Sequence, residues 1–290
     1  MKAVLVLKAL SPITHGAETA GNESLIRREA INTPVGVRHV PVITGNSLRH
    51  RLIREPIADA IAHDWQMTKE QLRWLYNGGA LDGKHPNVDV RRVMQARELM
   101  PHIEALGCSF DDTIVSGKLD MGIAWLACLE TTPVLKASLP QGWIDESPLS
   151  PSFEFLSRNQ YYRHDAARQR TELLADEDRN GEDYAGMPHG GEHVMPGAMF
   201  VCAIHADGLS DMACSAFVYA LERWAESGAT VGGQSSRGHG VVQPMLWTDS
   251  AIASEPFREH LDSRLNEIRE FISTLYVAPK EPKKGKGKAA

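Results

Sequence analysis

A polar, glycine-rich segment at residues 229–244, ATVGGQSSRGHGVVQP, constrains the fold of this chain more than any other stretch. It joins a predicted amphipathic helix, capped by Ser210, to a predicted strand with the sequence GVVQPML. The consecutive glycines Gly232 and Gly233 allow positive φ angles and a close approach of backbones. Such a segment is typical either of an anion-binding loop or of a tight crossover in which glycine relieves crowding, and its spacing alone favours neither.

The remaining apolar runs predict an α+β fold. Residues 2–10, KAVLVLKAL, are typical of a buried strand, and leucines and isoleucines recur at helical spacing over residues 48–62. A second β-rich portion begins near residues 113–130, and residues 198–206 predict another strand. Together with the helix and strand around the glycine-rich segment, the order is strand, helix, strands, strand, helix, strand. This is the order of a modified ferredoxin-like sheet.

Two insertions and a C-terminal extension complete the predicted organisation. The pattern of residues 64–106 is mainly helical, whereas residues 157–196 have too few apolar positions for a core, so we expect an arm or hairpin there. Residues 11–24 are broken by proline and glycine and predict a long loop. The predicted parts are a sheet domain (1–63, 107–156 and 197–250), a helical insertion (64–106), a hairpin (157–196), a C-terminal helix (251–277) and a basic disordered tail (278–290).

The charge distribution limits where a polyanion could bind. The chain of 290 residues has a formal net charge of −6, and its C-terminal APKEPKKGKGKAA carries five lysines against one glutamate, so the rest of the chain is more acidic still. A polyanion site would therefore have to be local, built from a few arginines and from backbone N–H groups.

Other bulk features exclude several classes of protein. No apolar run approaches the roughly 20 residues of a membrane span, and the N-terminus lacks the features of a signal peptide. We therefore expect a cytoplasmic protein without a membrane partner. The four cysteines are far apart and lack ligand spacing, which predicts buried free thiols and no metal site.

A second segment with anion-binding features is TGNSLRHRLIR at residues 44–54. Ser47 is the predicted N-cap of a helix whose first turns carry Arg49, Arg51 and Arg54. A helix N-terminus with exposed N–H groups and a neighbouring arginine favours a phosphate. A capped helix with a solvated basic face explains the same residues equally well.

The two segments occur in a combination that resembles a known superfamily. The combination consists of an early strand followed by SPITHGAE, and then of VPVITGNSLRHRLI, SGKLDMGIAWLACLET and ATVGGQSSRGHGVV. These stretches together resemble the RAMP superfamily of CRISPR-associated proteins. Within it, the chain is most similar to the Cas seven family, the subunits that form the guide-RNA-coating backbone of multisubunit effector complexes. The resemblance extends from about residue 1 to about residue 246. It implies a modified RNA-recognition fold in which the sheet domain is the palm, the helical insertion the finger and residues 157–196 a β-hairpin thumb.

The resemblance also implies a channel for the guide RNA (crRNA), with phosphates held by backbone N–H groups and Arg237 and little reading of bases. The implied RNA contacts are His15, Gly16, Asn46, Ser47, Arg49, Arg51, Arg163, Gly232, Gly233, Gln234, Ser235, Ser236 and Arg237. Met187 or Met195 would be the apolar wedge of the thumb. The implied partners are target DNA or RNA, further copies in a helical filament and other effector subunits, without a cofactor. The overall pattern is closest to type IV systems.

The resemblance does not predict an enzyme. In type III systems the backbone subunit cleaves target RNA with an aspartate in the loop after the first strand. The corresponding ETAGNESLIRRE here contains no aspartate, and Glu23 is the one candidate for a general base or a holder of a metal-bound water. A subunit without nuclease activity is expected.

Two enzymatic alternatives stay open at this point. One is a RAMP endoribonuclease, acting in crRNA processing with His15 or His39, or in type III-like cleavage of target RNA. The other is an enzyme for a small phosphorylated substrate that would use His15, Asp120, Arg237 and His239. The long polar arm favours the backbone subunit, because a processing enzyme needs no thumb.

Overall fold

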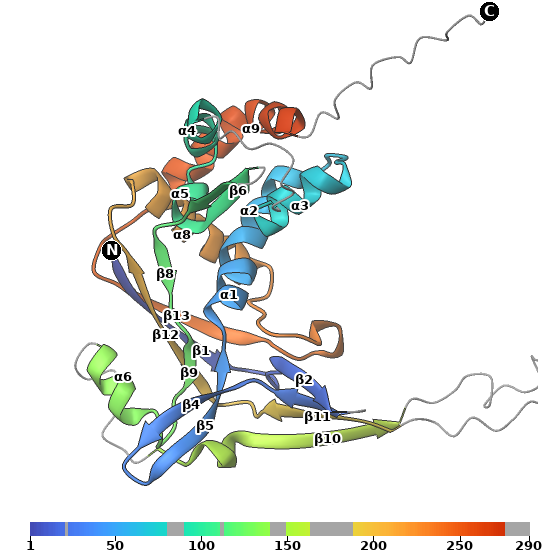
Figure 1. Ribbon diagram of the computed structural model, residues 1–290, viewed down its shortest axis with the longest axis vertical. Helices are drawn as coiled ribbons and strands as arrows, with labels where there is room; N and C mark the ends of the chain where they lie inside the picture. The colour runs from blue at the N-terminus through green and yellow to red at the C-terminus, as the bar shows by residue number, and fades with distance from the viewer. Residues whose placement is uncertain (21–22, 80–89, 111–112, 140–148, 163–187, 276–290) are drawn as a thin grey trace, which may run out of the picture. The chain divides into compact units, whose positions relative to one another are not determined.

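The computed structural model describes residues 1–20, 23–79, 90–110, 113–139, 149–162 and 188–275 (Figure 1). The chain divides into two compact units. The first consists of Met1–Ile53, Leu119–Asp207 and Leu221–Ala251, and the second of Arg54–Lys118, Gly208–Ala220 and Ile252–Ala290. None of the helices in the described ranges is long and apolar enough to cross a membrane.

A seven-stranded antiparallel sheet forms the core of the first unit, as far as the described residues extend. Its order is β13 (Val242–Thr248), β1 (Lys2–Ala9), β12 (Met199–Ala206), β9 (Ala124–Leu126), β5 (Gly36–Ile43) and β4 (Arg28–Thr33), with β8 (Leu119–Met121) also paired to β12. Strand β1 is buried almost throughout because it has a neighbour on each edge. The order of β13, β1, β12 and β9 agrees with the predicted ferredoxin-like sheet, so the α+β prediction is confirmed.

The predicted β-rich portion near residues 113–130 is divided into three short strands. Strand β7 (Thr113–Ser116) pairs with β6 (Gly107–Phe110) in the second unit, whereas β8 and β9 both pair with β12. Gly122 separates β8 from β9, and its N–H donates to the Ala203 carbonyl at 3.0 Å. A Cβ at Gly122 would also crowd that carbonyl, so glycine permits the close approach here.

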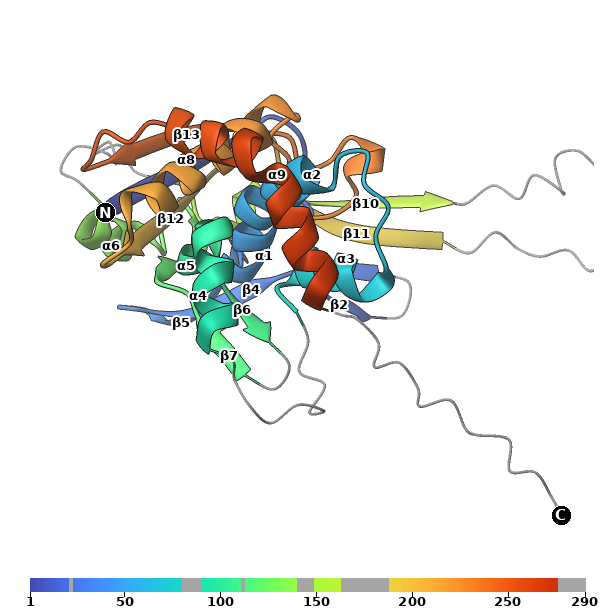
Figure 2. The same ribbon diagram turned by 90° about the horizontal axis from the view of Figure 1, so that it is seen from above.

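A four-stranded sheet in the same unit corrects one prediction. Its order is β10 (Leu156–Tyr162), β11 (Pro188–Val194), β3 (Glu23–Ile26) and β2 (Gly16–Ala20). Figure 2 shows β10 beside β11, its antiparallel partner. The expected long loop at residues 11–24 is therefore wrong, because β3 gains a parallel partner in β11 that the local glycine-rich sequence does not reveal. Most of the predicted hairpin lies outside the described residues.

The first long helical segment leaves β5 through Thr44 and comprises α1 (Gly45–Leu48), the π-helix η1 (Arg49–Arg54) and α2 (Glu55–Ala62). The Thr44 hydroxyl accepts a hydrogen bond from the Ser47 N–H at 3.4 Å, so Thr44 is the N-cap and the prediction of Ser47 was wrong. A Cβ at Gly45 would overlap the Met121 carbonyl. Glycine therefore lets α1 lie against β8.

Helix α8 (Asp211–Glu226) begins as predicted, because the Ala213 N–H donates to the Ser210 hydroxyl at 3.2 Å. Two short elements of the first unit, α6 (Thr132–Ser138) and the 3-10 helix η2 (Ser152–Phe155), follow β9. The predicted buried free thiols are confirmed for all four cysteines. Burial raises the pKa of Cys202 to about 12, so this thiol is unreactive near neutral pH.

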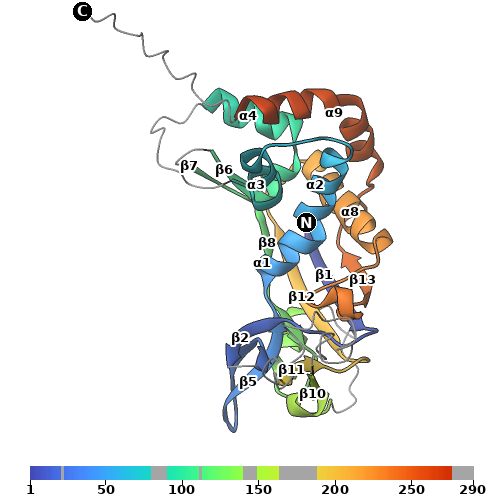
Figure 3. The ribbon, with the colours of Figure 1, turned by 90° about the vertical axis from the view of Figure 1, so that its right-hand side faces the viewer.

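The second unit is mainly helical. It contains α2, α3 (Lys69–Asn77), α4 (Val90–Leu99), α5 (His102–Leu106), β6, β7 and α9 (Glu255–Leu275), the last lying inside the predicted C-terminal helix at 251–277 but shorter at both ends. Helix α3 starts with a capping box between Thr68 and Gln71. Helix α9 packs along α2, α3 and α4 (Figure 3) and buries Phe257 and Phe271.

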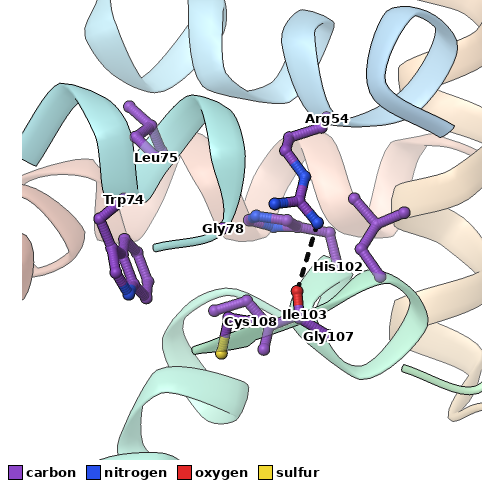
Figure 4. A pocket seen from close by; sticks show the side chains of 9 residues that line it. Arg54, Trp74, Leu75, Gly78, His102, Ile103, Gly107 and Cys108 are labelled. Carbon is purple, nitrogen blue, oxygen red and sulfur yellow. Dashed lines mark hydrogen bonds between the residues drawn. The ribbon is translucent and has the colours of Figure 1, made fainter. Parts of the chain in front are cut away.

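A small pocket lies within this second unit (Figure 4). Arg54, Trp74, His102 and Cys108 are among its lining residues, and Arg54 Nη2 donates to the Gly107 carbonyl at 3.4 Å. Burial, together with the charge of Arg54, lowers the pKa of His102 to about 3. His102 is therefore neutral at physiological pH.

Candidate nucleic-acid interface

The glycine-rich segment is a closed loop with a paired base. Thr230 and Val241 form an isolated antiparallel bridge, and the Val231 N–H donates to the Gly240 carbonyl at 2.9 Å. These contacts hold the two arms of the loop together just before β13. The eight residues at 232–239 therefore form a tip that projects from a fixed base.

The glycines of this loop allow it to approach residues 10–14. Gly232 has φ +73°, and a Cβ there would overlap the Thr14 carbonyl. The Gly233 N–H donates to the same carbonyl at 2.6 Å. A Cβ at Gly240 (φ +91°) would overlap the Val231 carbonyl. The tight-crossover explanation therefore holds for these glycines, and the Gly233 N–H is engaged by the protein itself.

Polar groups are concentrated at the tip of the loop. Gln234 adopts a left-handed conformation (φ 61°) and precedes the short 3-10 helix η4 (Ser235–Arg237). Ser235, Ser236 and Arg237 are exposed. Among the described residues, no backbone carbonyl accepts the N–H groups of Ser235 and Ser236. Two serine hydroxyls and a guanidinium thus lie on the exposed tip, and these are donor types suited to phosphate.

The second predicted segment starts at Thr44, where β5 ends. The Thr44 N–H donates to His15 Nε2 at 3.3 Å, and the His15 carbonyl accepts the Arg27 N–H at 2.8 Å. Burial lowers the pKa of His15, and the charge of Arg27 lowers it further. His15 is therefore a neutral hydrogen-bond acceptor that fixes the turn into α1. Gly16 and Asn46 beside it are exposed, whereas Ser47 is half-buried.

One side-chain contact joins the two predicted segments. Arg51 Nη2 donates to the Thr230 hydroxyl at 2.7 Å, across 179 residues of sequence. Thr230 lies at the base of the glycine-rich loop, and Arg51 lies in η1, where Arg49 is also half-buried. This hydrogen bond brings the two segments into direct contact. Arg51 contacts the loop, a partner that the sequence did not indicate.

Two histidines meet where the loop reaches β11. The Thr14 hydroxyl lies 2.8 Å from His239 Nδ1, and the rings of His239 and His193 meet edge to face with centroids 5.9 Å apart. Burial, and then the nearby His239, lowers the pKa of His193. Sequence reasoning missed Thr14, Thr44, Thr230 and His193. No local signal marks Thr14, Thr230 and His193, because their partners are distant in the chain, whereas Thr44 carries an N-cap signal no stronger than that of Ser47.

The candidate acid Glu23 lies in a charge network on the four-stranded sheet. Its carboxylate is 3.7 Å from Arg158 Nη1, and Arg158 also lies 3.4 Å from Glu192. Arg28 completes the network at 3.0 Å from Glu192. Burial alone would raise the pKa of Glu192, but the hydrogen bond and charge of Arg28 outweigh it and lower the pKa. Glu23 thus forms an ion pair with Arg158.

The other predicted site residues are dispersed. Met195 follows β11 and is 37% exposed, whereas Arg163 and Met187 lie outside the described residues. Asp120 is exposed on β8 opposite His205, and His39 is exposed on β5. Within the described residues, no hydrogen bond or ion pair joins Asp120 to His15 or His239. No group of three or more potential metal ligands is present in that part of the chain either.

Comparison with known proteins adds one informative likeness. No family model and no curated protein matches this sequence. A chain of the solved "Type IV-B CRISPR Complex" is similar in structure, with a TM-score of 0.60 over 88% of this chain and 93% of that chain, at 16% sequence identity. This chain and that chain therefore share a fold over most of their length. At this level of identity the likeness concerns the fold alone.

A second solved structure is that of Csc2 from Thermofilum pendens, with a TM-score of 0.39 and 13% identity over 95% of this chain and 80% of that chain. This similarity is too low to support a conclusion. The glycine-rich loop and residues 44–53 both belong to the first unit.

Proposed function

We propose that this chain is a backbone subunit of a multisubunit CRISPR effector complex of type IV, which binds the crRNA guide in the cytoplasm and presents it to target nucleic acid. Copies of the chain would assemble along the guide as a helical filament together with other effector subunits. The observation that carries the proposal is the fold shared over 88% of the chain with a component of a type IV-B CRISPR complex.

The geometry of the first unit supports RNA binding. Arg51 and Thr230 bring the segment at Thr44 next to the loop whose tip exposes Ser235, Ser236 and Arg237. The chain is acidic overall, yet residues 1–53 contain seven lysines and arginines against three glutamates. The local basic character and the donor-rich tip match a phosphate backbone better than a small apolar ligand.

In this proposal residues 64–106 act as the finger and residues 157–196 as the thumb. Strands β10 and β11 would be the root of the thumb, with Met195 beside it as an apolar contact for a base. The charge network of Glu23, Arg158 and Glu192 would stiffen this root. A nuclease role is not proposed, because His15 serves as a backbone hydrogen-bond acceptor and Glu23 is paired with arginine.

Native mass spectrometry of the protein with single-stranded RNAs of increasing length tests the proposal. Copies per RNA should rise in regular steps with length. Arg237→Glu should weaken assembly, whereas Lys136→Glu, a charge reversal at an exposed site on α6, should not. One copy at every length, or none, would contradict a filament-forming subunit. Shortened RNA in the same spectra would instead favour the endoribonuclease.

A further inference from the structure

Thr230 is a junction where three parts of the first unit meet. Its hydroxyl accepts a hydrogen bond from Arg51, its carbonyl accepts one from Trp224 Nε1 at 2.9 Å, and its backbone pairs with Val241. Trp224 is buried at the end of α8. The preceding Ala229 has φ 44°, a conformation that non-glycine residues rarely adopt. Such a conformation persists only where the surrounding contacts fix it.

The π-helix η1 explains how Arg51 reaches this junction. A π-helical turn contains more residues than an α-helical turn, so it changes the direction of the side chains that follow. Leu52 and Ile53 are completely buried in the same turn. The wider turn thus places two apolar residues in the core and still directs Arg51 to Thr230. π-Helical turns of this kind are frequent at functional sites.

We propose that Arg51 and Thr230 form a positioning pair that pre-shapes the glycine-rich loop for RNA. The proposal rests on the proposed function and changes the role predicted for Arg51. Arg51 acts on RNA through Thr230, by fixing the base of the loop. The exposed residues of the tip make the contacts with phosphate.

The loop needs such a support because its tip is rich in glycine. Beyond its paired base, the loop is anchored by Gly233 to Thr14, by Gly240 to the Pro12 carbonyl and by the His239 contact with Thr14. All of these anchors are on the side of residues 10–14. Arg51 holds the loop from another element, η1. Binding an ordered loop avoids the entropy cost of ordering it in the complex, so the pair raises affinity without touching the ligand.

The test uses the full-length protein and fluorescein-labelled single-stranded polyuridine RNA of 30 nucleotides, with Kd measured by anisotropy at several salt concentrations. Thr230→Val removes the acceptor hydroxyl and keeps the β-branched shape, and Thr230→Ser keeps the acceptor. We expect Thr230→Val to weaken binding about fivefold to tenfold, as loss of a typical intramolecular hydrogen bond would, and Thr230→Ser to restore binding to within about twofold of the natural chain.

Two further readouts separate positioning from direct phosphate contact. The dependence of Kd on salt should have the same slope in Thr230→Val as in the natural chain. The double variant Arg51→Gln/Thr230→Val should have a Kd no higher than that of the single variant with the higher Kd, because the two residues act as one unit. Hydrogen exchange at residues 231–240 of the free protein should become faster in Thr230→Val. Thermal unfolding of each variant shows whether it is folded.

Each outcome bears on one hypothesis. Unchanged affinity and unchanged loop exchange in Thr230→Val would overturn the positioning pair. A second result would also overturn the positioning pair. If Arg51→Gln alone weakens binding and lowers the slope of the salt dependence by about 0.7, Arg51 is a direct phosphate ligand. If the natural chain binds no RNA, the proposed function fails, whereas the hydrogen-exchange comparison still tests the pair. If Thr230→Val does not fold, Arg51→Lys tests the same contact, and we expect it to accelerate loop exchange.

Discussion

At the scale of single residues, the glycine-rich loop depends on glycines that let two backbone segments come close together. Gly232 and Gly240 have positive φ angles, and a Cβ at either would overlap a carbonyl oxygen. The Thr14 carbonyl accepts the Gly233 N–H, and the Thr230 hydroxyl accepts a hydrogen bond from Arg51 in η1. Ser235 and Arg237 are exposed on the tip, where we propose that they contact a ligand. Conformation and chemistry are thus divided between different residues of one loop.

Gly232 provides a direct test of this division. Gly232→Ala should lower the free energy of unfolding by roughly 1 to 3 kcal/mol, because alanine is strained at φ +73° and its Cβ would overlap the Thr14 carbonyl. Gly233→Ala is the matched control, since its Cβ would lie 3.8 Å from the same carbonyl in ordinary contact. Urea denaturation measures both variants. Equal losses would show that the steric argument is wrong.

At the scale of elements, the helix after β5 begins earlier than its sequence indicates. Both Thr44 and Ser47 are good N-cap residues, and the arginines that follow are compatible with either. The structure selects Thr44 because Gly45 packs against Met121, which fixes the first turn against β8. Tertiary contact therefore decided between two equally good local signals.

Thr44→Ala should lower the free energy of unfolding by about 1 kcal/mol, because the Ser47 N–H loses its capping acceptor. Thr44→Ser should retain most of that stability. Ser47→Ala should stay within about 0.5 kcal/mol of the natural chain, since its hydroxyl is not the cap. Chemical denaturation of the three variants decides the assignment. If Ser47→Ala lowers the free energy of unfolding more than Thr44→Ala does, Ser47 is the N-cap residue.

At the scale of the whole molecule, acid should destabilise the chain through a buried histidine in the second unit. The pKa of His102 is about 3 in the folded chain, below its ordinary value of 6.5. Between these two values the unfolded chain binds a proton that the folded chain does not. Stability should therefore be complete above pH 6.5 and decline as the pH falls toward 3, by about 3 kcal/mol at pH 4.

Denaturation at pH 7.5, 6, 5 and 4 measures this decline. His102→Asn should be less stable at neutral pH but should show a shallower decline in acid, since the titrating group is gone. His63→Gln removes an exposed histidine and should leave the decline as it is. An equally steep decline in His102→Asn would assign the acid sensitivity to other groups.

The sequence predicted the elements whose signals are local. Strand β1 and helices α8 and α9 follow from apolar runs and helical spacing. Strand β1 and the start of α8 agree with the prediction to within one residue, whereas α9 begins four residues later than the predicted 251–277. Strands β2 and β3 were missed, because their stability comes from β11, which pairs with Glu23 through Gly190 far along the chain. The local sequence of residues 11–24 does not indicate a strand partner that lies so far along the chain.

The same distinction applies to the candidate site. The amino-acid sequence by itself determined the α+β order, the position of the glycine-rich loop between a helix and a strand, and the RAMP resemblance, because these depend on periodicity and on short motifs. Only the tertiary structure decided that Arg51 meets Thr230, that Gly233 binds Thr14 and that His193 meets His239. These contacts join residues far apart in the chain. Such pairs form only when burial of the sheet and helices brings them together, so no local pattern encodes them.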